Sequence, residues 1–169
     1  DLPDMLERDL MGATKPVASH QNTIAAERAA RLGSDTDLAV VQAVFDKMAA
    51  AHAKPNSDED AKLDAQFHMA IIEASHNVVM LHMMRSMYQL LRDGVFYNRQ
   101  IMFKQRTTRQ ALLEQHRAIN TALQSRDAQS ARDAVRMHMD YVERALRDQQ
   151  DAEHNEAIAR QRLDHETGA

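Results

Sequence analysis

Apolar residues recur three or four positions apart along almost the whole chain, which is the spacing of one face of an α-helix. The stretch LLEQHRAINTAL, residues 112–123, shows this clearly, because its large apolar side chains fall on a single stripe. Only 4 Gly, 3 Pro and 4% aromatic residues occur in 169 residues, whereas β-sheet proteins need turn residues and β-branched or aromatic strands. The pattern predicts an all-α antiparallel bundle of six or seven helices with short loops.

The composition excludes several classes of protein. The chain has no Cys, so it has no disulfides, no Cys-based zinc site and no catalytic thiol. We find no apolar run near the roughly 20 residues of a membrane span, and the first residues, DLPDMLERDL, are too acidic and polar for a secretory signal. The net charge of −4 makes the chain by itself a poor nucleic-acid binder. We therefore expect a soluble, cytoplasmic domain.

Turn and capping residues divide the chain into helical segments. Gly33 and Ser34 separate two of them, and residues 54–58 (KPNSD) form the clearest loop. The later helices are expected over about 58–75, 78–104 with Gly94 as a weak point, 107–126, and from 128 onward, with Asn77 and Asp127 as N-caps. We expect residues 1–150 to form one domain, in which 1–23 is the least regular part, and residues 151–169 to be a helical extension or a disordered tail.

Three predicted helices each direct a histidine into the bundle. Asp64 and His68 are four residues apart, so they share one helix face, which continues through apolar residues at 71 and 72. His116 lies in the apolar stripe of its helix, and His138 lies between two valines on the core stripe of the last helix. We therefore expect these four side chains to point inward.

Buried imidazoles need partners, and a divalent cation would supply a common one. Neutral His nitrogens and a carboxylate oxygen are ligands for zinc and similar first-row ions. The alternative is that each histidine is a singly hydrogen-bonded core residue, since Asp-x-x-x-His pairs are common on helices. Spacing alone leaves both interpretations open.

Three other sequence features give weaker indications of function. Glu73 and His76 match half of a di-iron carboxylate motif, but we find no second half, so di-iron chemistry is not expected. The methionines at positions 80, 83, 84 and 87 form a helical stripe that packs in a core or dimer interface, or forms an adaptable pocket wall. Basic residues at positions 99, 104, 106 and 109 indicate a solvated surface, in which one Arg could hold a carboxylate.

The segments LDAQFHMAIIEASHNVVML (63–81) and EQHRAINTALQSRDAQSARDAVRMHMDYV (114–142) resemble the effector-binding (FCD) domain of FadR-type regulators in the GntR superfamily. The resemblance runs from about Ile24 to Leu146 and is closest to the lactate- and glycolate-responsive members. It implies an all-helical bundle in which Asp64, His68, His116 and His138 hold a divalent metal, and in which the carboxylate of a small acid completes the coordination. Residues 8–23 (RDLMGATKPVASHQNT) depart from the family pattern.

The resemblance also implies partners. We expect a homodimer that binds a small hydroxy acid, such as lactate or glycolate, or a dicarboxylate, and that reaches operator DNA only through a winged-helix domain absent from these 169 residues. Zinc is the favoured metal, with nickel and manganese as alternatives. Candidate effector contacts are Asn77, Met84, Arg99 and Arg106.

Two other functions stay open at this point. A metalloenzyme would need a general base beside the metal, and the nearest candidates, Glu73 and Glu114, are predicted to face solvent, so no enzymatic activity is expected. A purely structural dimerisation module would bind neither metal nor acid.

Overall fold

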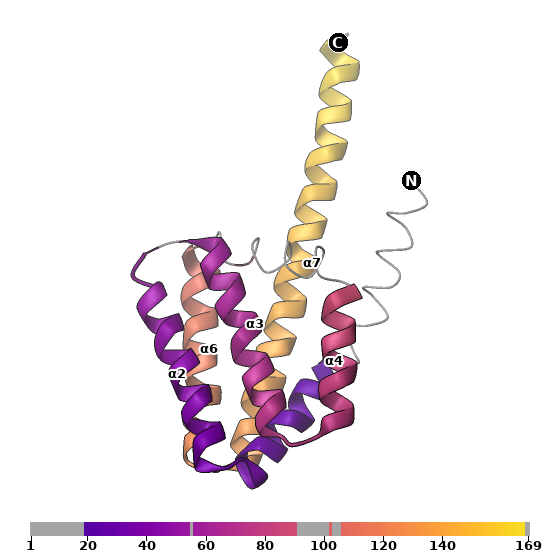
Figure 1. Cartoon of the computed structure of the whole chain (residues 1–169). Coiled ribbons are helices and arrows are strands. Elements are labelled where there is room, and N and C mark those ends of the chain that lie inside the picture. Colours follow the sequence, from indigo (N-terminus) through magenta and orange to yellow (C-terminus); the bar gives the residue numbers. More distant parts are fainter. Residues whose placement is uncertain (1–18, 55, 91–101, 103–105, 168–169) are drawn as a thin grey trace.

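The computed structural model describes residues 19–54, 56–90, 102 and 106–167, and all of its regular structure in these ranges is helical. After the helical residues 19–32 come α2 (Asp35–Ala51), α3 (Ser57–Ala74), α4 (Val78–Leu90), α6 (Arg106–Gln124) and α7 (Ala128–Thr167). Successive helices from α2 onward run in alternating directions (Figure 1). The prediction of an all-α antiparallel bundle is confirmed.

Local capping chemistry sets the helix starts, as predicted. Ser34 and Asp37 form a reciprocal capping box at the start of α2, and the Asn56 side chain accepts hydrogen bonds from two backbone amides of α3. The side chains of Asn77 and Asp127 accept from the backbone amides of Met80 and Ser130 in the same way. The caps therefore stand within one or two residues of the predicted boundaries.

Gly33 is required by a close approach of backbones. It follows the helical residues 19–32, and its amide donates to the Ala29 carbonyl over 2.9 Å. A Cβ at this position would lie 2.6 Å from the same carbonyl oxygen. No side chain fits there without a backbone shift, so the tight link into α2 needs glycine.

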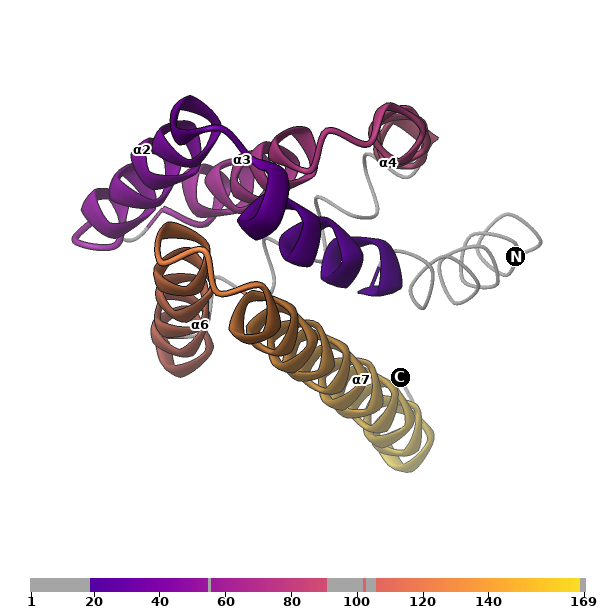
Figure 2. The same ribbon diagram turned by 90° about the horizontal axis from the view of Figure 1, so that it is seen from below.

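The bundle consists of two packed pairs of helices. α2 packs on α3, α6 packs on α7, and α2 also contacts α6, while α4 packs on α3. Viewed along the bundle, the helical residues 19–32 lie across the end where α3 joins α4 (Figure 2). Their small side chains at positions 25, 26, 29 and 30 are buried in the main core, together with Phe67, Ile72, Met84 and Ile119.

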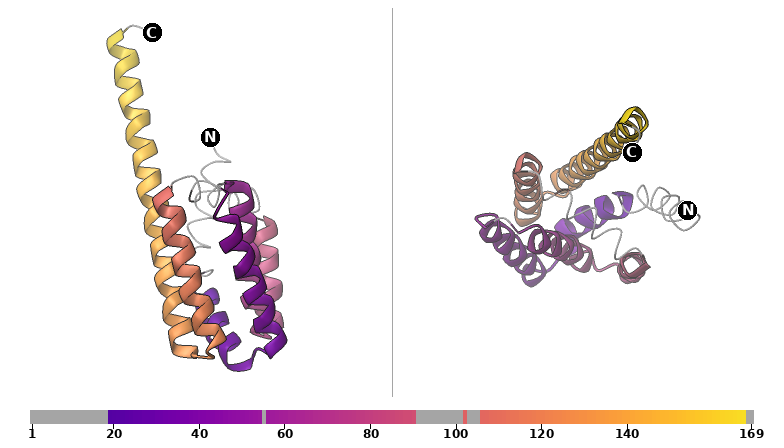
Figure 3. Two further views of the ribbon diagram at one scale, coloured as in Figure 1. Left: turned by 90° about the vertical axis from the view of Figure 1, so that its left-hand side faces the viewer. Right: turned by 90° about the horizontal axis from the view of Figure 1, so that it is seen from above.

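The last helix, α7, extends well beyond the helical core of the domain. α7 contributes buried side chains only as far as Leu146, and its remaining turns extend beyond the other helices (Figures 1 and 3). Residues 147–167 are almost entirely exposed and helical. Pairs such as Arg147 with Glu143 and Arg160 with Glu156, each four residues apart, lie along its surface and support a solvated helix. Among the described residues, no helix is both long and apolar enough to cross a bilayer.

Candidate metal centre

Asp64 and His68 lie one turn apart on the inward face of α3. Their exposed fractions are 6% and 4%, and His68 Nε2 lies 3.8 Å from Asp64 Oδ1. The same face carries Phe67 and Ile71, which are buried in the main core. The apolar pattern therefore forces a carboxylate and an imidazole into the interior, where an ion without a partner is costly.

His116 on α6 meets this pair from the opposite helix. It is completely buried, and its Nε2 lies 3.1 Å from Asp64 Oδ1. Its ring stands edge-on to Phe67, with 5.2 Å between ring centroids. Neither ring nitrogen of His116 has a hydrogen-bond partner of acceptable geometry, although buried polar atoms are nearly always satisfied.

His138 on α7 completes the group. It is 2% exposed, and its Nε2 lies 3.2 Å from Nε2 of His68. Its other nitrogen, Nδ1, lies 2.9 Å from the side-chain oxygen of Gln115 on α6. The rings of His116 and His138 are also close, with centroids 4.5 Å apart.

Together the four side chains form one buried donor set. Each offers a ligand atom, and all four atoms lie within 4.8 Å of one another. Donors bound about 2.0–2.2 Å from one ion stand about 3–4 Å apart, which suits the observed contacts of 3.1, 3.2 and 3.8 Å. Three imidazoles and one carboxylate are a normal zinc-type ligand set, and the unsatisfied nitrogens of His116 fit a missing partner. The residues present therefore can hold a metal ion.

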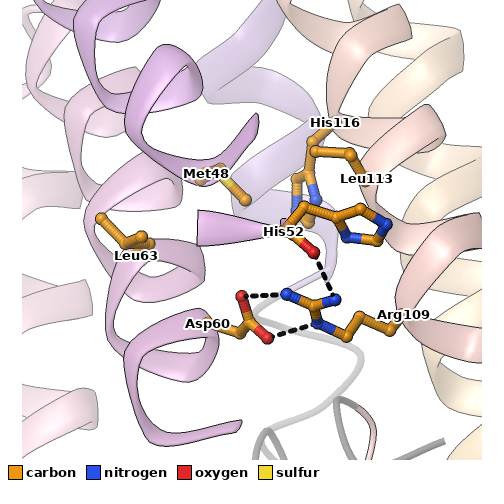
Figure 4. A pocket seen from close by; sticks show the side chains of 7 residues that line it. All are labelled: Met48, His52, Asp60, Leu63, Arg109, Leu113 and His116. Atoms are coloured by element: carbon orange, nitrogen blue, oxygen red, sulfur yellow. Dashed lines mark hydrogen bonds and ion pairs between the residues drawn. The ribbon is translucent and has the colours of Figure 1, made fainter. Parts of the chain in front are cut away.

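Beside His116 lies a cavity of about 10 Å³, roughly the room that one water-sized group requires. Arg109 and Asp60 close one side of it (Figure 4). The full lining is Met48, His52, Asp60, Leu63, Arg109, Leu113 and His116.

Arg109 is buried, which corrects the prediction that the basic residues near it form a solvated surface. Its guanidinium donates to both carboxylate oxygens of Asp60, over 2.6 and 3.3 Å, and to the carbonyls of His52 and Ala51, over 2.7 and 3.0 Å. It thus binds two carbonyls at the end of α2, where helical partners run out, and pairs with the first turn of α3. The carboxylate that this arginine holds belongs to the protein.

The predicted effector contacts lie in different places. Asn77 caps α4 through Met80, Met84 is completely buried in the main core, and Arg106 is exposed at the start of α6. Arg99, together with Gly94 and Lys104, lies outside the described residues.

The two predicted solvent-facing carboxylates, Glu73 and Glu114, are exposed. His76 follows the C-cap Ser75 of α3 in the left-handed region, with φ 51°, and its ring contacts Asp37 over 2.7 Å. Its place at the helix end agrees with the interpretation that it closes α3 rather than binding iron.

Sequence reasoning missed two polar contacts. Arg109 precedes His116 by seven residues, which is two helical turns. It therefore lies on the same apolar stripe, and this spacing could have predicted that Arg109 is buried. Gln115 stands next to His116 in the sequence, and nothing local indicates that it reaches His138 on the next helix.

Comparisons with known proteins agree with this architecture. The family model described as "FCD domain" matches residues 23–141. A putative L-lactate dehydrogenase operon regulatory protein of Escherichia coli K12 is 36% identical over 99 residues, which are 57% of this chain and 38% of that protein. The Glc operon transcriptional activator of the same strain is 32% identical over 127 residues, 73% of this chain and 50% of that protein. The chain thus spans half or less of these relatives.

A solved structure, E. coli McbR/YncC, has the same fold. Its TM-score is 0.71 at 17% sequence identity, and the match covers 83% of this chain and 65% of that one.

The relatives that match this chain are named as regulators of transcription, so the fold and the matched family together place the chain in a class of regulator domains. This chain is a member of the FCD domain family of GntR-type regulators. Its relatives are regulators rather than enzymes.

Proposed function

We propose that this domain senses a small carboxylic acid at a divalent metal ion held by Asp64, His68, His116 and His138. His116 carries the proposal, because it is completely buried and both of its ring nitrogens lack a hydrogen-bond partner. Leaving a buried polar group unsatisfied costs about 1–3 kcal/mol. A metal ion bound to one of the two nitrogens removes that nitrogen's share of the cost by accepting its lone pair.

Each ligand contributes chemistry that suits the role. Asp64 supplies the negative charge, and the three neutral imidazoles add σ-donor nitrogens without further charge, so a bound divalent ion keeps a net positive charge. A bound ion with open coordination positions attracts a carboxylate. Zinc is favoured for this ligand set, and nickel or manganese are alternatives.

The class of acid is proposed from the relatives. One is named for an L-lactate dehydrogenase operon and another for the Glc operon. A short hydroxy acid such as lactate or glycolate presents a carboxylate and an adjacent hydroxyl, which suit two neighbouring coordination positions. A small dicarboxylate is the alternative. The predicted contacts Asn77, Met84, Arg99 and Arg106 remain part of this proposal.

The signal follows from the arrangement of the ligands on three different helices. An acid that binds one arrangement of α3, α6 and α7 more tightly than another shifts the population toward it. In a homodimeric parent regulator of the cytoplasm, that shift would reach operator DNA through a DNA-binding domain outside this chain. The coupling can be no larger than the difference in affinity between the two arrangements.

Elemental analysis of tag-free protein purified without chelator tests the metal centre. We expect about one transition metal ion per chain, its loss in His116→Ala, and its retention in His154→Ala, whose histidine is exposed on the distal part of α7. Protein that stays metal-free after addition of zinc and nickel would refute the centre and favour a structural dimerisation module.

Thermal melting in the presence of lactate, glycolate and small dicarboxylates tests the acid. A bound acid raises the melting temperature by mass action, and we expect that rise only with metal-loaded protein. An equal rise in His116→Ala would contradict binding through the metal.

A further inference from the structure

Gln115 connects α6 to the fourth ligand on α7. Its side chain is partly buried, and its Oε1 lies 2.9 Å from Nδ1 of His138. The two residues are 23 positions apart in the sequence, so the contact exists only because the two helices pack together. It faces away from the cluster, since the other nitrogen of His138 faces His68.

This contact selects one form of the imidazole. A side-chain amide oxygen has lone pairs but no proton, so it can only accept a hydrogen bond. The proton of neutral His138 must therefore reside on Nδ1, which donates to Gln115. Nε2 then carries the lone pair, and Nε2 is the atom 3.2 Å from Nε2 of His68. In the other tautomer, Nε2–H would point into the donor set and block it.

We infer that Gln115 is a positioning residue of the metal centre, which holds His138 in the Nδ1–H tautomer and fixes its ring with Nε2 aimed at the ligand set. The inference rests on the proposed metal function for its purpose, although the tautomer itself is a property of the metal-free protein. Outer hydrogen bonds of this kind fix the orientation of metal-bound histidines and strengthen their basicity.

His116 gives the contrast that makes this contact informative. Neither of its nitrogens forms a hydrogen bond, and its contacts are the Phe67 ring on one side and the Asp64 carboxylate within the donor set. His138 is instead held from outside the cluster by a polar side chain. Gln115 is also neutral, so it orients the ligand without changing the charge around the ion.

The chain offers a matched control. Gln110, on the same helix, lies 2.8 Å from Nε2 of His52, which is not one of the four ligands. Gln110→Leu removes a glutamine–histidine contact of the same kind outside the donor set. Gln115→Leu removes the acceptor at His138, and Gln115→Glu keeps it.

The first measurement is the tautomer of His138 in metal-free wild-type protein, from long-range ¹H–¹⁵N correlation spectra at slightly alkaline pH. We expect the Nδ1–H form in wild type and in Gln110→Leu, and a shift toward Nε2–H in Gln115→Leu. An Nε2–H tautomer in wild type would overturn the inference without touching the proposed metal site.

The second measurement is zinc affinity by competition with a chromophoric chelator. Loss of an outer hydrogen bond to a ligand weakens metal affinity by about 10- to 100-fold, and we expect this in Gln115→Leu, with near wild-type affinity in Gln110→Leu and Gln115→Glu. Unchanged affinity in a folded Gln115→Leu would refute the positioning role. Absence of zinc binding in wild type would refute the proposed function instead, and the tautomer would still be tested.

Discussion

The buried pair of Arg109 and Asp60 allows a prediction with a defined magnitude. Both side chains are less than a tenth exposed, and the guanidinium makes four contacts, two to Asp60 and two to the last carbonyls of α2. Arg109→Met keeps the apolar stem but removes all four. Asp60 then stays as a buried carboxylate without its guanidinium, and breaking a buried pair from one side costs about 3–5 kcal/mol.

Urea denaturation and thermal melting of chelator-treated protein measure this loss. For a domain of this size, 1 kcal/mol corresponds to about 2–4 °C in Tm, so Arg109→Met should melt roughly 6–20 °C below wild type. Arg85→Met is the matched control, because Arg85 pairs with Glu73 over 2.8 Å but both side chains are about half exposed. Such exposed pairs contribute about 0–1 kcal/mol.

A double variant separates the pair from simple loss of packing. Adding Asp60→Asn to Arg109→Met removes the unpaired buried charge of the Asp60 carboxylate. We expect the double variant to regain about 2 kcal/mol of unfolding free energy relative to Arg109→Met, which is within the range of coupling for contacting residues. If Arg109→Met costs no more than Arg85→Met, the buried pair adds no more stability than an exposed one. If the stability losses of Arg109→Met and Asp60→Asn simply add in the double variant, Arg109 and Asp60 are not coupled.

Three further outcomes are expected. Zinc at about 100 times Kd should raise the unfolding free energy of wild type by about 2.7 kcal/mol and that of His116→Leu not at all, because the variant lacks one of the four ligands. Equal melting shifts in both proteins would contradict the site. Ser34→Ala should cost about 1 kcal/mol in urea titrations by removing the capping box of α2, whereas an unchanged midpoint would show that the cap adds nothing. Hydrogen bonds from the Ser34 side chain and backbone lower the pKa of Asp37. The ionised Asp37 therefore contributes its full stability above the unfolded-state pKa of about 3.9, and this contribution is lost as the pH falls through the lower folded-state pKa. Asp37→Asn should lose this part of the acid dependence in melts between about pH 5 and 2, and a pH profile identical to wild type would refute the argument.

The starts of α2, α3, α4 and α7 followed from the sequence because their causes are local. The predicted end of the helix 78–104 lies outside the described residues. Apolar spacing gives a helix one buried face, and Ser34, Asn56, Asn77 and Asp127 cap neighbouring backbone amides within three residues. The same local reasoning placed each of the four candidate ligands on an inward face. The family resemblance then grouped them, which spacing alone left open.

The tertiary structure decided which inward faces meet. His68 and His138 are 70 positions apart, and Arg109 and Asp60 are 49 apart, so their contacts depend on how α3, α6 and α7 pack and on the rotation of each helix about its axis. A shift of one residue turns a helix by about 100° and would separate the donors. The sequence thus determined which side chains enter the core, and only packing determined that four of them converge, that Arg109 is buried, and that Gln115 reaches His138.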